Sequence, residues 1–120
     1  SILLGDFNIA PKADDVWSHK QLINTVSHTE IERKKIDELL IKGDWVDTIR
    51  CFVKPPNNLF TWWSYRSPDY KKNNRGRRLD HCWITSDLKQ LVKKARILDY
   101  TRAWDVPSDH VPLLIDIADN

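Results

Sequence analysis

The run Leu79-Asp80-His81-Cys82-Trp83-Ile84-Thr85 combines apolar, aromatic and β-branched side chains, a composition that favours a β-strand. Successive side chains of a strand point to opposite faces, so Asp80, Cys82 and Ile84 are expected to share one face. The other face then carries Leu79, His81 and Trp83. The sequence therefore predicts a strand over residues 79–85.

Two further strands are predicted on the amino-terminal side of this run. Residues 60–65 are rich in aromatic and β-branched side chains. Residues 2–4 are continuously apolar and Gly5-Asp6-Phe7-Asn8 breaks them, which indicates a buried strand that ends in a loop. The apolar residues of the segment 11–27 follow neither helical nor strand periodicity, so we expect a long loop with a helical turn near residues 14–17.

Residues 29–42 carry the clearest helix signals in the chain. Thr29 at the N-cap and Glu32 three residues later match a capping box, and Gly43 is a typical helix stop. The expected apolar stripe consists of Ile36, Leu39 and Leu40, with Ile31 near it. We assign this helix a scaffold role without chemistry.

The last third of the chain is predicted to alternate helix and strand. Ser86 is expected to cap a second helix. The inward face of that helix would consist of Leu88, Leu91, Val92 and Ala95. Residues 96–101 and 111–117 resemble strands, whereas residues 45–53 are a mixed apolar stretch of open type.

Strands and helices thus alternate, with a hairpin-like pair in the middle, which indicates an α/β or α+β layered domain. The 120 residues, 41% hydrophobic and 30% charged, fit one globular domain and exclude a disordered tail or a disulfide-dense mini-protein. No apolar stretch approaches the roughly 20 residues that span a bilayer, and no leader-like segment opens the chain.

The net charge of +2, from 19 basic and 17 acidic residues, favours no particular partner. The charge is unevenly distributed, because residues 66–78 contain six basic residues and a single acidic one, Asp69. Such a local patch suits a polyanion. On charge alone, a solvated basic loop explains it equally well.

Cys51 and Cys82 each lie in an apolar run without metal-ligand spacing. We expect two free buried thiols in a reducing compartment, with a single disulfide as the alternative. The chain contains no methionine and begins directly in an apolar run. We therefore expect a piece of a longer protein.

Three segments hold acidic, amide or imidazole groups beside predicted strand ends: residues 5–8, 78–81 and 108–110. Each alone is best explained as an ordinary turn or cap. Together they could converge on one site suited to phosphodiester hydrolysis. A carboxylate activates water, an amide or imidazolium holds a phosphate oxygen, and oxygen ligands bind Mg²⁺ or Mn²⁺.

An aromatic cluster, Trp62, Trp63 and Tyr65, runs directly into the basic stretch. Aromatic rings can stack on bases while Arg and Lys hold phosphates. The alternative is that one tryptophan simply belongs to the core. Since neighbours on a strand face opposite ways, we expect one tryptophan inside and one outside.

Four phrases resemble the exonuclease/endonuclease/phosphatase superfamily and, within it, the bacterial exodeoxyribonuclease III branch of apurinic/apyrimidinic endonucleases. They are Gly-Asp-Phe-Asn-Ile-Ala-Pro (5–11), Thr-Trp-Trp-Ser-Tyr-Arg (61–66), Asn-Arg-Gly-Arg-Arg-Leu-Asp-His (74–81) and Pro-Ser-Asp-His-Val-Pro (107–112). The two middle phrases point to the DNA repair branch. The resemblance covers essentially the whole chain. It implies half of a four-layer α/β sandwich of the deoxyribonuclease I-like type, with a mixed, mostly antiparallel sheet and helices on one face.

The resemblance also implies catalytic roles. Asp6 would be the acid/base at the attacking water or the leaving group, and Asn8 would hold the phosphate beside it. His110 would contact the scissile phosphate, oriented by Asp80. The ligands of Mg²⁺ (or Mn²⁺) would be Asp6, Asn8, Asp109 and His110.

The implied partner is duplex DNA with abasic sites or 3′ ends. Trp62 would pack against the abasic nucleotide, while Arg66, Arg75 and Arg77 would grip the backbone. The parent enzyme would cut 5′ to abasic sites and remove nucleotides from 3′ ends. Its place would be base excision repair in the cytoplasm, with no membrane partner.

In this family the first half of the fold supplies an essential glutamate metal ligand, an asparagine and a tyrosine, and none can be placed here. We therefore expect residues 1–120 to be the carboxy-terminal half, with one sheet face uncovered and available for self-association. Two alternatives stay open. One is a phosphoinositide-type phosphatase of the same superfamily, which the Trp62-Trp63 pair disfavours. The other is a non-catalytic DNA-binding or assembly module.

Overall fold

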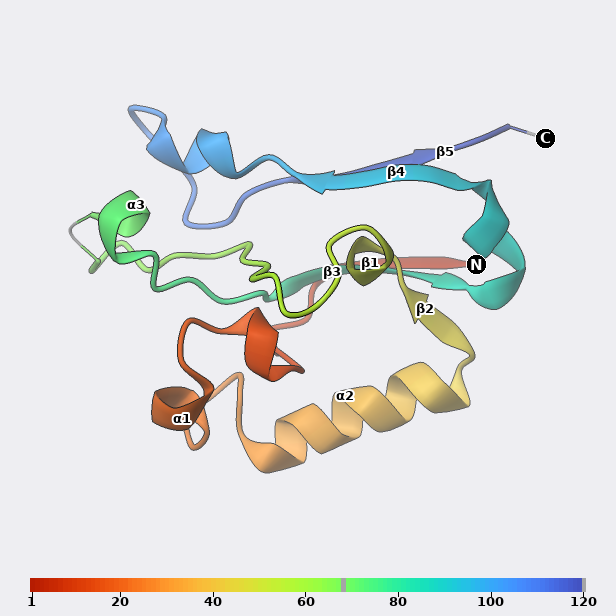
Figure 1. Ribbon diagram of the computed structural model, residues 1–120, viewed down its shortest axis with the longest axis horizontal. Helices are drawn as coiled ribbons and strands as arrows, with labels where there is room; N and C mark the ends of the chain where they lie inside the picture. Colours follow the sequence, from red (N-terminus) through yellow and green to blue (C-terminus); the bar gives the residue numbers. More distant parts are fainter. Residues whose placement is uncertain (68, 120) are drawn as a thin grey trace.

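A computed structural model describes residues 1–67 and 69–119 of the chain (Figure 1). Its central sheet contains β1 (Ile2–Asp6), β3 (Asp80–Thr85) and β2 (Trp45–Asp47) in the order β1-β3-β2. Both pairings are antiparallel. The strand predicted over residues 79–85 is therefore confirmed within one residue, and it is the middle strand of the sheet. The strand predicted at residues 2–4 is also confirmed, but the expectation that it is buried is wrong, because β1 is an edge strand whose Ile2 and Leu4 are 47% and 69% exposed.

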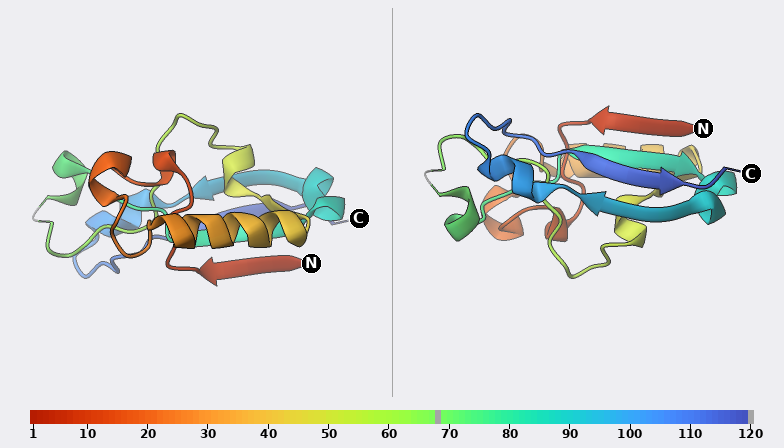
Figure 2. Two further views of the ribbon diagram at one scale, coloured as in Figure 1. Left: turned by 90° about the horizontal axis from the view of Figure 1, so that it is seen from below. Right: turned by 90° about the horizontal axis from the view of Figure 1, so that it is seen from above.

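A second, two-stranded antiparallel sheet pairs β4 (Val92–Ile97) with β5 (Leu113–Ile117). Figures 1 and 2 show three layers: helix α2 on one face of the central sheet and the β4–β5 sheet on the other. Residues Ile49, Leu59 and Ala95 form a buried cluster against β4 and β5. The predicted layered arrangement of antiparallel strands, with the long helix on one face, is confirmed.

Helix α2 (Glu30–Lys42) begins as predicted. The Thr29 side chain accepts a hydrogen bond from the Glu32 backbone N–H, and the Glu32 carboxylate accepts one from the Thr29 N–H. Gly43 caps the other end. Only part of the predicted stripe is covered, because Ile36 is buried whereas Ile31 and Leu39 are 65% and 56% exposed.

The remaining helical elements are short. They are η1 (Ala13–Asp15), α1 (His19–Leu22), η2 (Ile49–Cys51), α3 (Tyr70–Asn73), η3 (Ser86–Leu91) and η4 (Asp99–Ala103). The turn expected near residues 14–17 is η1. Over residues 1–67 and 69–119, every helix is too short or too polar to cross a bilayer.

The helix predicted after Ser86 is wrong beyond its first turns. Residues 86–91 form the 3₁₀ helix η3, and Val92 and Ala95 belong to β4. Ala95 is buried while Lys94 and Arg96 are exposed, which is the two-residue alternation of a strand. Pairing with β5 along this stretch outweighs the helical spacing of a few apolar residues.

The strand predicted over residues 96–101 is wrong for its second half, because β4 ends at Ile97 and η4 begins at Asp99. The last strand begins at Leu113 and not at residue 111. Pro112 has no N–H to donate, and the Val111 N–H bonds to the Thr61 carbonyl instead of a strand partner.

The strand predicted over residues 60–65 is also wrong. Trp62 forms isolated β-bridges with Arg77 and with His110, and no strand is assigned around it. Aromatic residues favour strands because they pack well on a half-buried pleated surface. In this segment they are packed by loops instead, without a continuous strand. The expected split of the tryptophan pair is confirmed, because Trp63 is 4% exposed and Trp62 is only partly buried.

Both cysteines are free thiols, as the first interpretation of the sequence predicted. Cys82 is buried in β3, and burial raises the pKa of its thiol. Cys51 is only partly buried.

Candidate active site

The three predicted segments meet at one corner of the molecule. Antiparallel pairing of β1 and β3 places Asp6 directly opposite Asp80. His110 reaches the same corner because its backbone bridges to Trp62. One ligand atom from each of Asp6, Asp80 and His110 lies within 4.8 Å of the other two.

His110 lies between the two carboxylates. Its Nδ1 is 2.8 Å from Asp80 Oδ2, and its Nε2 is 3.7 Å from Asp6 Oδ2. Partial burial lowers the pKa of His110, but the hydrogen bond and charge of Asp80 and the charges of Asp6 and Asp109 outweigh it and raise the pKa above its ordinary value. When protonated, the ring directs one N–H at Asp80 and presents the other beside Asp6. The predicted orientation of His110 by Asp80 matches this geometry.

Thr61 holds Asp80 in place, and the sequence analysis missed it. Its hydroxyl donates to Asp80 Oδ2 at 2.7 Å and accepts from the backbone N–H groups of Leu79 and Asp80. Thr61 is fully buried. A hydroxyl inside an aromatic run costs free energy unless it is hydrogen-bonded, and that is the signal that could have identified it.

Asp6 and Asn8 form a tight turn after β1. The Asn8 N–H donates to Asp6 Oδ1 at 2.9 Å, and Asn8 adopts a left-handed conformation with φ of 56°. Asparagine tolerates this conformation better than most residues. The turn fixes the Asp6 carboxylate and leaves the Asn8 side chain exposed next to it.

Two buried histidines hold the loop that follows this turn. His81 Nε2 lies 2.8 Å from the Ile9 carbonyl, and His28 Nδ1 lies 2.6 Å from the Ala10 carbonyl. A carbonyl only accepts, so each of these ring nitrogens carries a proton. Burial and the charge of Arg78 lower the pKa of His81 to about 4, and burial also lowers the pKa of His28. Both rings are therefore neutral supports for the loop.

Asp109 is not a member of the Asp6, Asp80 and His110 group. Its Oδ2 accepts a hydrogen bond of 3.0 Å from Trp62 Nε1, and its carbonyl accepts from the Trp63 N–H. This contact ties the plane of the Trp62 ring to the segment that carries His110. The predicted metal-ligand role of Asp109 stays a prediction.

Arg78 differs from the other cations of the basic stretch. It is 1% exposed, and it donates to Asp47 Oδ1 at 2.8 Å and to Asp15 Oδ2 at 3.0 Å. Arg50 donates to the same Asp15 carboxylate. Although burial lowers the pKa of Arg78, the charges and hydrogen bonds of Asp15 and Asp47 raise it. This buried cluster, absent from the sequence analysis, joins η1 and β2 to the start of β3.

The predicted DNA contacts lie on two neighbouring segments. The Arg77 guanidinium lies over the Trp62 ring, 5.3 Å from its centroid, and donates to Ser27 Oγ at 3.1 Å. Arg66 and Arg75 are exposed. The structure thus brings Trp62 and Arg77 together beside His110, and their contacts to DNA stay a prediction.

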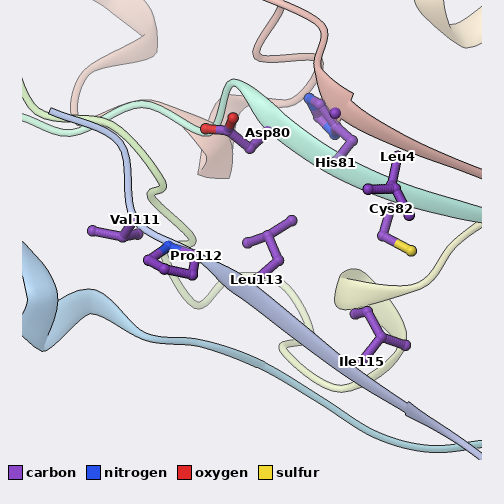
Figure 3. Close-up of a pocket in the computed structure, with 9 residues that line it drawn as sticks. Leu4, Asp80, His81, Cys82, Val111, Pro112, Leu113 and Ile115 are labelled. Carbon is purple, nitrogen blue, oxygen red and sulfur yellow. The ribbon is translucent and has the colours of Figure 1, made fainter. Parts of the chain in front are cut away.

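A cavity of about 230 Å³ lies between the two sheets, next to the candidate site (Figure 3). Leu4 of β1, Cys82 of β3 and Leu113 and Ile115 of β5 line it. Figure 3 shows Asp80 at one end of the cavity, whereas His81 points away from β5 on the opposite face of β3. Asp80 of the candidate site therefore borders the space between the two sheets.

The donor set at this corner suits a hard divalent cation. Asp6 is partly exposed, and its Oδ2 makes no hydrogen bond within the described residues. Mg²⁺ typically binds through one or two carboxylates and keeps several waters. The second carboxylate, Asp80, already bonds His110 and Thr61 through Oδ2, which makes Asp6 the better ligand of the two.

The model of the Endonuclease/Exonuclease/phosphatase family matches residues 1–110. Among curated proteins, the exodeoxyribonuclease of Bacillus subtilis is 31% identical over 118 residues, covering 97% of this chain and 44% of the relative. The exodeoxyribonuclease III of Haemophilus influenzae is 30% identical, covering 93% of this chain and 43% of the relative.

Solved structures agree with this similarity. A 3′-5′ exonuclease from Neisseria meningitidis superposes with a TM-score of 0.87 at 32% identity, over 97% of this chain and 44% of that chain. An AP endonuclease from Archaeoglobus fulgidus superposes with a TM-score of 0.89 at 29% identity, over the same shares. The chain thus spans less than half the length of each of these relatives.

Proposed function

Because this chain belongs to the endonuclease/exonuclease/phosphatase family, we propose that it forms part of a DNA repair nuclease that hydrolyses phosphodiester bonds. The observation that carries the proposal is His110 held between Asp80 and Asp6, at 2.8 and 3.7 Å. The names of the relatives, exodeoxyribonucleases and AP endonucleases, support DNA as the substrate.

In the proposed reaction, water attacks the phosphorus atom and the bond from phosphorus to the leaving oxygen breaks. The raised pKa of His110 favours its imidazolium form, which donates a hydrogen bond to a phosphate oxygen as negative charge develops. Asp80, fixed by Thr61, keeps the ring oriented. Asp6 accepts a proton from the attacking water or, as the acid, protonates the leaving oxygen.

We assign the divalent cation, Mg²⁺ or Mn²⁺, to the side of the corner that Asp6 and Asn8 form. Asp109 and His110 are further ligand candidates. Nδ1 of His110 is already bonded to Asp80, which leaves Nε2 for a phosphate oxygen or for the metal ion. A bound cation would neutralise phosphate charge and make water more acidic.

We infer that the substrate is duplex DNA with abasic sites or 3′ ends. Trp62 is the proposed contact for the abasic nucleotide, because its ring is held by Asp109 beside His110. Arg66, Arg75 and Arg77 are the proposed backbone contacts. The proposed setting is base excision repair in the cytoplasm.

We also propose that the chain is the carboxy-terminal half of the family's domain, since it covers 43–44% of several relatives. Ile2 and Leu4 of β1 are 47% and 69% exposed, and Ile117 of β5 is 38% exposed. These apolar side chains support the proposed self-association, because exposed apolar patches commonly mark interaction surfaces.

The test is cleavage of a labelled duplex that carries one abasic-site analogue, with Mg²⁺ and with chelator. We expect the parent protein to cleave in a metal-dependent way and its rate to fall by about 10²- to 10⁴-fold in Asp6→Ala and in His110→Ala. The isolated 120-residue chain is expected to be inactive, because the glutamate ligand of the family's first half cannot be placed in it. Asp116→Asn, an exposed acid on β5, is the matched control and should cleave normally. Equal rates in wild type and both site variants would contradict the assigned roles.

Two other outcomes favour the alternatives. Turnover of inositol phosphates without cleavage of duplex DNA would favour a small-substrate phosphatase. Duplex binding that weakens steeply with salt, without cleavage at any Mg²⁺ concentration, would favour a non-catalytic binding module.

A further inference from the structure

Four short segments lie side by side next to the candidate site. His110 bridges to Trp62, Trp62 bridges to Arg77, and Arg77 bridges to Val16. The Trp17 N–H donates to the Gly76 carbonyl at 3.1 Å, which extends the last contact. The backbone therefore forms a continuous path from His110 outward to Trp17.

Trp17 carries a second aromatic-basic pair at the outer end of this path. The Arg75 guanidinium lies over the Trp17 ring, 4.7 Å from its centroid. Trp17 is only partly exposed and packs on two buried clusters, those of Val16 and of Phe60. The ring is therefore a fixed surface, and the stacked guanidinium loses little further freedom when it binds an anion.

Arg75 differs from its two basic neighbours in its hydrogen bonding. Arg77 donates to Ser27 and Val26, and Arg78 donates to Asp15 and Asp47. Arg75 is exposed, and within residues 1–67 and 69–119 its side chain donates to no protein acceptor and pairs with no carboxylate. Its N–H donors are held in place but open to a ligand.

Gly76, which lies between Arg75 and Arg77, packs closely against Phe60. A Cβ at Gly76 would lie 2.6 Å from Phe60 Cβ, so only glycine allows this close approach. The approach anchors the backbone between the two arginines. Each guanidinium then stacks on its own tryptophan.

We propose that Trp17 and Arg75 form a second phosphate-binding position on the nucleic acid, with Trp17 as the positioning residue for Arg75. Two to three strand spacings of about 4.8 Å separate this pair from His110, which is roughly 10–15 Å. Neighbouring phosphates of one DNA strand lie further apart through space than their advance along the axis, roughly 6–7 Å, so the contact falls about two nucleotides from the bond at His110. This inference rests on the proposed function and adds the distance from His110 at which a second phosphate is bound.

The experiment measures binding of the 120-residue chain to labelled duplexes by fluorescence anisotropy over a range of salt. The duplexes carry one abasic-site analogue and are shortened from each end in turn, down to one nucleotide from the analogue. The variants are Arg75→Gln, Arg75→Lys, Trp17→Phe and the double variant Trp17→Phe/Arg75→Gln. Lys93→Gln, an exposed charge at the far end of β4, is the matched control.

On long duplexes we expect Arg75→Gln to weaken binding about three- to tenfold and to reduce the salt slope by about one. Arg75→Lys should fall between Arg75→Gln and wild type, because ammonium keeps the charge but loses the planar stack. Trp17→Phe should weaken binding about two- to fivefold, with no additional loss in the double variant. Shortening one end below about two nucleotides should abolish all these differences.

Equal binding by Arg75→Gln and Lys93→Gln would overturn the inference, and so would an Arg75→Gln defect that is unchanged on the shortest duplexes. Additive losses in the double variant would overturn the role of Trp17. These outcomes leave the proposed function standing, since wild-type binding is measured in the same series. No binding by the wild type would instead overturn the DNA-binding function itself.

Discussion

Two charged clusters meet at the start of β3, and they have opposite characters. Arg78 joins the buried cluster with Asp15 and Asp47, in which Arg78 and Asp15 have side-chain exposures of 1% and 0%. Asp80, only two residues later, joins His110 and Asp6, and these three side chains are 18%, 31% and 38% exposed. Two positions separated by one residue thus belong to two different kinds of site.

The two clusters differ in whether their charged groups already have hydrogen-bond partners. Both Asp15 oxygens accept from arginines, so the buried cluster has no carboxylate oxygen on Asp15 left to offer a ligand. In the open cluster, His110 Nε2 and Asp6 Oδ2 face each other at 3.7 Å, beyond hydrogen-bond distance. A buried, saturated cluster stabilises the fold, whereas a partly exposed and unsaturated one is available for chemistry.

The strongest test of this contrast is Arg78→Met. The change leaves Asp15 and Asp47 without their shared cation, and removing one partner of a buried ion pair typically costs about 3–5 kcal/mol. We expect the free energy of unfolding, measured by urea titration, to fall by that amount. Lys12→Met breaks the exposed pair with Asp37 and should cost less than about 1 kcal/mol. Similar losses in the two variants would contradict the structural role of the buried cluster.

Lowering the pH should change the contributions of His81 and His110 to stability in opposite directions. The pKa of His81 is about 4 in the folded protein, below its ordinary 6.5, so the unfolded chain binds the proton more tightly. Stability should therefore fall as the pH drops from about 6.5 towards 4, by roughly 3 kcal/mol in total from this group.

The raised pKa of His110 acts with the opposite sign. Its contribution is fully present below its ordinary pKa and is lost as the pH rises through the raised value. Urea unfolding across this pH range, in wild type and in His81→Gln, isolates the first effect. An unchanged pH dependence in His81→Gln would show that His81 does not cause it.

The smallest expected effect concerns Thr61, which supports the open cluster from inside the fold. Thr61→Val keeps the shape but leaves the N–H groups of Leu79 and Asp80 without their acceptor. We expect a loss of about 1–3 kcal/mol in stability and faster amide hydrogen exchange at both residues by NMR. Thr61→Ser retains the hydroxyl and should behave almost as wild type. Equal exchange in Val and Ser variants would refute this role.

The parts of the structure that sequence analysis predicted well depend on local signals. The capping box of Thr29 and Glu32 lies within four residues, and the apolar, aromatic and β-branched composition that predicted β3 lies within seven. The pairing of Asp80 with His110 was inferred from family resemblance, and the observed contact agrees with it. The first two signals are local, whereas Asp80 and His110 are 30 positions apart and only the family resemblance brought them together.

The errors concern contacts between distant segments. Asp15 and Arg78 are 63 positions apart, so the sequence offered no reason to separate Arg78 from the other cations of the basic stretch. Thr61 acts on Asp80, 19 positions away. Ala95 became part of a strand because β5 pairs with it, although its spacing from Leu88 and Leu91 fits a helix. In each case the tertiary partner decided the outcome.

The register of β1 against β3 makes the catalytic corner intolerant of small insertions and deletions. Asp6 faces Asp80 because five consecutive residue pairs match from Ile2 and Ile84 onward. Removing one residue from β1 would turn its side chains to the opposite face and move Asp6 away from His110. Loops such as residues 54–58 carry no such constraint. Length variation in homologous chains should therefore concentrate in those loops and leave β1 and β3 unchanged in length.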